Sequence, residues 1–355
     1  MLQTALGWAC LPLCGAILLA AGAAGQTVGA EQRPLPRSLD PQQILSWLPP
    51  DTETVIVARN FTLPDLTVPE KSRVYTQELL FAGLALTPGE GINKPVLSYF
   101  KNQQISMAMQ GSRKFRSPNG FGLMPFEGCT FIIFAEQLSD RADEYFKVAS
   151  ASTLRTDEVD GHKVLVFQNR LYSDTPTWTT FVGFVTPNVL LVATDMDYLR
   201  EVLSRIAGKN GARALPETLL EWRYVDTSAQ FWGLRHFDRT RGDEDPSSPF
   251  WDPRKSVRAP WSDEQAIGLT FIYDPAAGKG PTITYLSGDP SVAREFLALR
   301  HSGDKFRSVV RELDAKAIAA SYSLEHPEAM MFTFYLTYLL GHGIFTQPTP
   351  LNVPR

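Results

Sequence analysis

Pairs of short strand-like segments, followed by helical patterns, constrain the fold of this 355-residue chain more than any other sequence feature. One pair runs from Trp178 to Val185 and from Val189 to Ala193, with a Pro187-Asn188 turn between its strands. An amphipathic pattern then continues to Ile206, where Gly208 is placed to end a helix. Antiparallel hairpins followed by single helices put helices on one face of a sheet, so we predict an α+β fold with antiparallel sheets.

The same strand–strand–helix pattern recurs in three other places. The expected strand pairs are 105–109 with 129–135, 267–273 with 282–286, and 306–313 with 316–324. Helices are expected to follow them from about Asp140, Asp289 and Pro327. An Asp160-Gly161 hairpin within 154–167 separates the first two units. The residues of the four units do not match, so a true duplication stays a hypothesis.

The region before these units also has clear local signals. Asp40 is a natural N-cap for a short helix, Pro41 fits its first turn, and Pro49-Pro50 ends it. A strand is expected over 54–58 and a second helix over 74–86. This region therefore predicts a compact start to the folded part of the chain.

Two stretches carry a resemblance to a known group of proteins. They are Trp47-Leu-Pro-Pro-Asp-Thr-Glu-Thr-Val-Ile-Val-Ala-Arg59 and Val189-Leu-Leu-Val-Ala-Thr-Asp195, which leads directly into a helical pattern. They resemble exported bacterial proteins of unknown function, which begin the mature domain with a Leu-Pro-x-Asp-Thr turn and a strand. The resemblance implies export and the α+β class, and it implies no activity or site residues.

An apolar stretch from Ala5 to Gly25 has the form of an export signal. Small residues at its end permit cleavage after Ala24 or after Gly25, and no charged side chain precedes Glu31. We therefore expect a periplasmic, cell-surface or extracellular protein. The stretch lacks Lys and Arg before it and is long enough to span a bilayer, so an uncleaved anchor is the alternative.

These signals divide the chain into five expected regions. A break in the helical pattern near 208–213 suggests a boundary between two lobes. The regions are a signal or anchor (1–25), a linker (26–39), a first α+β lobe (40–210), a second α+β lobe (211–345) and a tail (346–355).

Charge and cysteine content limit the classes of partner and of stabilising bond. A net charge of -4 gives no basic face for nucleic acid, so we expect none as a partner. Cys10 and Cys14 leave with the signal, so Cys129 is the single thiol of the mature chain and no intramolecular disulfide is expected. A membrane is expected as a partner only if 5–25 stays uncleaved.

A long charged segment, 235–261, is the first candidate for chemistry. Segments of this length without secondary structure are usually functional or disordered. Its nitrogen and oxygen ligands suggest a divalent metal site at His236, Asp238, Asp243 and Asp245. The spacing matches no closed ligand set, and a solvated loop of mutually paired charges is the alternative. No cofactor is otherwise expected.

A second candidate surface combines basic and aromatic residues. The segment 112–126 places Arg113, Lys114, Phe115 and Arg116 together, a composition that suits an anion site. The alternative is an exposed hairpin tip with Phe121 and Met124 folded onto the core. Exposed tryptophans bind sugars, so a carbohydrate site would use Trp232, Trp251 and Trp261.

No catalytic, metal or nucleotide motif stands out in the sequence, which favours a non-enzymatic role. We therefore expect an exported binding or scaffolding protein of the cell envelope that uses 112–126 and 235–261 to bind a protein or glycan. The alternatives are a secreted metal-assisted hydrolase and a carbohydrate-binding protein.

Overall fold

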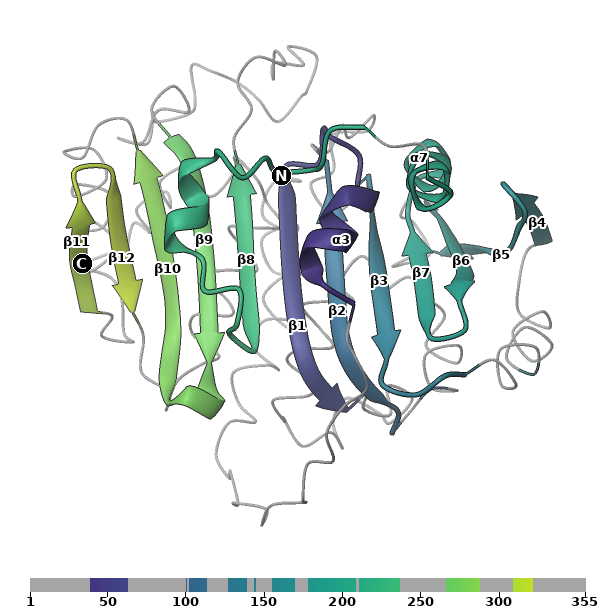
Figure 1. The fold of residues 1–355 in the computed structure, drawn as a ribbon, viewed down its shortest axis with the longest axis horizontal. Helices are drawn as coiled ribbons and strands as arrows, with labels where there is room; N and C mark the ends of the chain where they lie inside the picture. Colours follow the sequence, from purple (N-terminus) through teal and green to yellow (C-terminus); the bar gives the residue numbers. More distant parts are fainter. Residues whose placement is uncertain are drawn as a thin grey trace, which may run out of the picture.

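A computed structural model describes residues 39–62, 100, 102–113, 127–138, 144, 155–169, 178–208, 211–236, 266–287 and 309–321. Within these residues, twelve strands form one antiparallel sheet in the order β11-β12-β10-β9-β8-β1-β2-β3-β7-β6-β5-β4 (Figure 1). The strands are β1 (Thr54–Thr62), β2 (Gln104–Ser112), β3 (Gly128–Phe134), β4 (Arg155–Val159), β5 (His162–Asn169), β6 (Trp178–Thr186), β7 (Val189–Ala193), β8 (Phe231–His236), β9 (Ala266–Asp274), β10 (Lys279–Ser287), β11 (Val309–Asp314) and β12 (Ala317–Ser321).

The central strands are buried on both faces. Every residue of β3 and of β7 is buried, which explains why their sequences are nearly continuous apolar runs instead of apolar and polar residues in alternation. β1 lies at the middle of the sheet, where it pairs with β2 on one side and with β8 on the other. The β1–β8 pair places Val57 opposite Trp232, on two strands that lie far apart in the chain.

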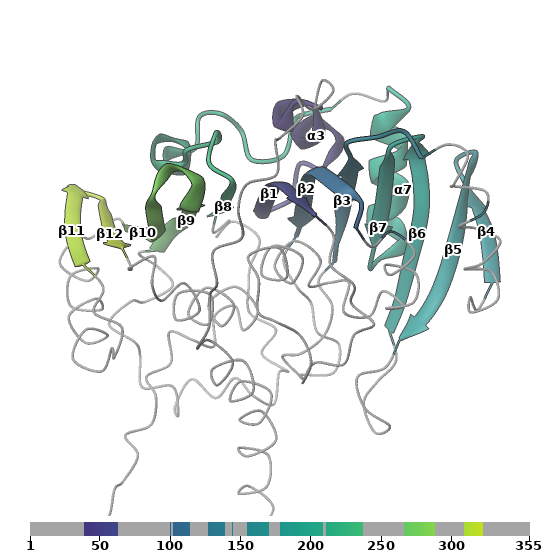
Figure 2. The same cartoon turned by 90° about the horizontal axis from the view of Figure 1, so that it is seen from below.

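Two short α-helices pack beside each other on one face of the sheet (Figure 1, Figure 2). In α3 (Pro41–Trp47), Asp40 accepts a hydrogen bond from the Gln42 amide and Pro41 occupies the first position, so the predicted start of this helix is confirmed. In α7 (Met196–Ile206), Asp195 is the N-cap, and Gly208 follows with a φ of 92°, as expected of a residue that ends a helix. Neither described helix is long and apolar enough to cross a membrane.

The predicted α+β class is wrong, because the described residues are essentially all-β. Among them, only the β6–β7 pair leads directly into a helix. The expected repeats of strand, strand and helix are replaced by strands that join edge to edge in one antiparallel sheet, through pairs such as β1–β8 and β3–β7. The helices expected over 74–86, from Asp289 and from Pro327 lie outside the described residues, and the one over 140–149 is described only at Glu144.

The predicted boundary between two lobes lies at residues 210 and 211. The β1–β8 pair joins strands from both sides of that boundary. The division of the chain into the expected regions stays a prediction.

Cys129 lies in the core that β3 shares with α7, where its side chain is 1% exposed. Burial raises the pKa of this thiol well above its usual value. We expect iodoacetamide to alkylate Cys129 at least about 100-fold more slowly in the native protein than in urea, since a buried thiol reacts only when the structure opens. Peptide mass spectrometry measures the rate, and a cysteine at the exposed position Glu158 is the control. Equal native and denatured rates at Cys129 would contradict its placement.

Candidate functional site

The two long segments singled out in the sequence leave the sheet at the same end, the upper end in Figure 1. Antiparallel pairing sets Ser112 opposite Gly128 at the base of 114–126, and His236 opposite Gly268 at the base of 237–265. We call this edge of the sheet, formed by the ends of β1, β2, β3, β8 and β9, the loop-bearing end.

Backbone hydrogen bonds through Glu53 connect the bases of the two segments. The His236 amide donates to the Glu53 carbonyl at 2.8 Å, and the Glu53 amide donates to the Ser112 carbonyl at 3.0 Å. On the far side of β2, the Arg113 amide donates to the Glu127 carbonyl at 2.9 Å. The ends of β2 and β8, the strands that lead into the two segments, are therefore both hydrogen-bonded to the same residue, Glu53.

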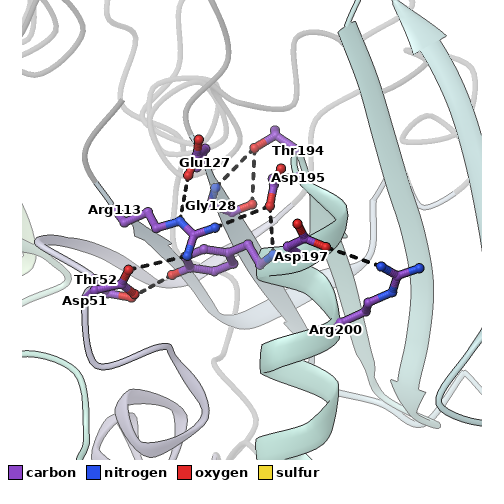
Figure 3. A network of polar contacts seen from close by, with 10 residues as sticks. Asp51, Thr52, Arg113, Glu127, Gly128, Thr194, Asp195, Asp197 and Arg200 are labelled. Carbon is purple, nitrogen blue, oxygen red and sulfur yellow. Dashed lines mark hydrogen bonds and ion pairs between the residues drawn. The ribbon is translucent and has the colours of Figure 1, made fainter. Parts of the chain in front are cut away.

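Arg113 lies among three carboxylates at this end (Figure 3). Its guanidinium is 2.7 Å from Glu127, 3.4 Å from Asp51 and 3.5 Å from Asp195, measured between the nearest nitrogen and oxygen atoms. It also lies over the ring of Tyr198, 5.3 Å from the ring centre. Arg113 thus connects the base of the 114–126 segment to the turn before β1 and to the start of α7.

The electrostatics of this cluster favour a charged Arg113. Burial alone would lower the pKa of the guanidinium, but the hydrogen bond to Glu127 and the charges of Asp51, Glu127 and Asp195 outweigh burial and raise it. Among the described residues, three carboxylates surround this one guanidinium. The predicted anion site at Arg113 therefore has an acidic surrounding that the sequence did not reveal.

Tyr198, whose ring lies under the Arg113 guanidinium, is itself held by two hydrogen bonds. Its hydroxyl lies 2.7 Å from the Thr52 hydroxyl, and its amide donates to the Asp195 carboxylate at 2.8 Å. Burial raises the pKa of the Tyr198 phenol well above its usual value, so the phenol stays neutral. The start of α7 is thereby fixed against the turn before β1.

We expect Arg113→Ala to lower the free energy of unfolding by about 1–3 kcal/mol, since it leaves three partly buried carboxylates facing one another. Urea denaturation measures this loss. Arg200→Ala is the control: Arg200 is 61% exposed and pairs with an Asp197 that is 82% exposed, so its loss is expected to change stability by less than about 0.5 kcal/mol.

A second-site change tests the cause of the Arg113 effect. Asp195→Asn removes one of the three charges and keeps an N-cap residue for α7. Added to Arg113→Ala, it is expected to restore part of the lost stability. If the two losses in free energy of unfolding were simply additive, so that the double variant was less stable than Arg113→Ala by the full cost of Asp195→Asn alone, like-charge repulsion would not be the cause.

His236 is held by a buried carboxylate at the base of the other segment. The 3₁₀-helix η3 (Leu220–Tyr224) lies over β8 and β9 and places the Glu221 Oε1 atom 2.7 Å from His236 Nδ1. The Glu221 side chain is fully buried, whereas His236 is 30% exposed. Gly268 makes room for this contact, because a Cβ atom there would lie 2.3 Å from Glu221 Oε1. The contact fixes the orientation of the His236 ring.

Nine sequence-predicted site residues remain. The structure describes one of them, Trp232, and corrects its predicted role; the other eight lie outside the described residues. Trp232 is fully buried in the core and packs edge-on against Trp222, so it is no surface residue for sugar binding. Outside the described residues lie Lys114, Phe115, Arg116, Asp238, Asp243, Asp245, Trp251 and Trp261. In the described part of the chain, no three His, Cys, Asp or Glu side chains are grouped to hold a metal ion.

Sequence reasoning missed the acidic partners of both segments. Asp51 and Asp195 contact Arg113 although they lie far from it along the chain. Glu221 contacts His236 from a 3₁₀-helix that the sequence pattern did not predict. Asp195 alone carried a local signal, since it precedes an amphipathic pattern as an N-cap would.

Comparisons with known proteins do not assign the chain to a family. No protein-family model matches the chain, and no curated protein matches it. Among solved structures, crystal forms III and I of TP0453 are similar at TM-scores of 0.44, with 9% and 8% sequence identity. The alignments cover 83% of this chain and 98% and 97% of those chains. A likeness at this level supports no statement about function.

Proposed function

We propose that the protein is an exported binding or scaffolding protein of the cell envelope that contacts its partner through 112–126 and 235–261. Export rests on the signal-like stretch from Ala5 to Gly25. The observation that carries the binding surface is the position of both segment bases at the loop-bearing end, joined through Glu53. Segments that connect the strands of a rigid sheet carry function more often than the sheet itself.

The contacts at the two bases support a surface presented in a fixed position. Arg113 ties one segment to α7 and to the turn before β1, and Glu221 holds His236 at the start of the other. A surface whose base is already ordered loses less conformational entropy when it binds. This favours recognition of a specific partner.

A segment replacement tests the proposal. Residues 240–258 are exchanged for a Gly/Ser linker of equal length, and partners are recovered from the native envelope by affinity capture and mass spectrometry. We expect the replaced protein to lose partners that the unaltered protein recovers. A four-residue Gly/Ser insertion at the Asp160-Gly161 turn, near the far edge of the sheet, is the control and should keep them. Recovery of the full partner set by the replaced protein would refute the proposal.

The second candidate function is a metal-assisted hydrolase that uses His236, Asp238, Asp243 and Asp245. The observation that favours it is the Glu221–His236 contact, because a histidine that binds a metal usually donates its other ring N–H to a carboxylate or carbonyl. Metal analysis of the purified protein tests this candidate: it requires stoichiometric metal and a lower melting temperature on chelation.

A further inference from the structure

The sequence contains one Asn-x-Ser/Thr triplet, Asn60-Phe61-Thr62, and it lies at the end of the central strand β1. Every other asparagine in the 355-residue chain lacks Ser or Thr two positions later. In exported proteins this triplet is the acceptor for N-linked sugar when its middle residue is not proline. The sugar is bulky and hydrophilic, so the acceptor asparagine has to lie at the surface of the fold.

Asn60 is exposed, although its neighbours in β1 are not. Arg59 is half-buried, and Phe61 is only 3% exposed. Asn60 has a φ of 53°, in the left-handed region that asparagine adopts more readily than most residues. Its backbone carbonyl accepts a hydrogen bond from Gln230 at 3.3 Å, whereas its side-chain amide makes none with a described residue. The Asn60 Nδ2 atom is therefore available for modification at a position that the strand fixes.

Asn60 also lies far from the loop-bearing end (Figure 1). Thr54, the first residue of β1, pairs with Ser112 and with Arg235 at the bases of the two segments. Asn60 follows six positions later in the same strand. A strand rises about 3.3 Å per residue, so about 20 Å of strand separate Asn60 from those bases. A sugar on Asn60 is thus attached away from the proposed binding surface.

The third residue of the triplet is occupied in the folded protein. The Thr62 hydroxyl donates a hydrogen bond to Gln104 Oε1 at 3.1 Å, across the pair of β1 and β2. The acceptor pattern requires a hydroxyl residue at this position. An enzyme that recognises the Thr62 hydroxyl reaches it most easily before β1 pairs with β2, while the chain is being exported. Folding then leaves Asn60 at the surface.

We propose that Asn60 is a site of N-linked glycosylation. The donor is an oligosaccharide joined to a membrane lipid through a diphosphate. Asn60 Nδ2 forms a bond to C1 of the first sugar and loses one proton, the bond between C1 and the diphosphate oxygen breaks, and the lipid diphosphate is released. The inference rests on the export in the proposed function, because the chain meets this donor outside the cytoplasm.

Mass spectrometry of the protein recovered from the native envelope tests the proposal. We expect the peptide that contains Asn60 to carry a sugar chain on that residue. Thr62→Ala is expected to abolish the sugar, and Thr62→Ser, which keeps the hydroxyl and the acceptor pattern, is the matched control that keeps it. Asn60→Gly removes the acceptor and suits the left-handed backbone, so the sugar is lost while circular dichroism shows a folded protein.

Cell fractionation separates a failure of this inference from a failure of the proposed function. An exported protein with an unmodified Asn60 would overturn the inference and leave the proposed function standing. A protein found only in the cytoplasm would overturn both. A sugar on Asn60 that persists in Thr62→Ala would also contradict the proposal, since the modification would then not depend on the triplet.

Discussion

Replacing Trp232 with alanine is expected to lower the free energy of unfolding by about 3–5 kcal/mol, the usual cost of removing a large buried aromatic side chain. Trp232 is fully buried in β8, opposite Val57 of the central strand. Its ring also packs edge-on against Trp222, with 6.0 Å between ring centres and an angle of 64° between ring planes. The change would leave a cavity between the sheet and η3. Urea denaturation measures the loss.

Trp232→Phe is the matched control. The indole Nε1 atom is buried and has no hydrogen-bond partner among the described residues, so phenylalanine removes an unsatisfied donor and keeps most of the ring contacts. We expect it to cost less than about 1.5 kcal/mol. The pair also tests the carbohydrate interpretation: if Trp232→Ala left stability unchanged but abolished binding on a glycan array, the core placement of Trp232 would be wrong.

Replacing Gly128 with alanine is expected to cost about 3 kcal/mol, at the upper end of the range for overpacking. Gly128 begins β3, opposite Ser112 at the base of the 114–126 segment. A Cβ atom there would lie 2.4 Å from the Gly111 carbonyl oxygen and 3.0 Å from the Ser112 Cα atom. These are backbone atoms of β2, so relief requires the two strands to move apart. Thermal and urea unfolding measure the effect.

Gly233→Ala makes the same chemical change inside another strand of the sheet. A Cβ atom at Gly233 would have the Val55 carbonyl oxygen as its nearest neighbour at 3.3 Å, which a small shift can relieve. Alanine also lowers the entropy of the unfolded chain, so we expect a change within about 1 kcal/mol. Equal costs at Gly128 and Gly233 would show that the close approach of β2 and β3 is not as described.

Local signals in the sequence predicted local structure well. The α3 N-cap at Asp40, the Asp160-Gly161 hairpin and the Pro187-Asn188 turn each depend on residues within a few positions of one another, and the structure has all three. The pairing of β1 with β8 depends on residues nearly two hundred positions apart, so no local pattern could reveal it. The predicted α+β class is wrong for another reason: the regular structure of the described residues is mostly strand and includes two short α-helices, where repeated strand–strand–helix units were expected.

At the candidate site, too, the sequence predicted individual residues but not their long-range contacts. The sequence identified Arg113 and His236 as chemically notable, but it could not supply their partners. Asp195 reaches Arg113 because β7 ends beside β3, and Glu221 reaches His236 because Gly268 leaves space for its carboxylate. Contacts of this kind decide whether a charge is available to a ligand, and they follow only from the tertiary fold.

The central claim is that 112–126 and 235–261 form one binding surface at the loop-bearing end, and photo-crosslinking from both segments tests it most directly. A photoreactive amino acid is placed at Lys114 in one variant and at Phe237 in another, and each is irradiated in the native envelope. We predict that both variants crosslink to the same partner, while the same amino acid at the Asp160 turn does not. Crosslinks to different partners from the two segments, or to none from either, would contradict the claim.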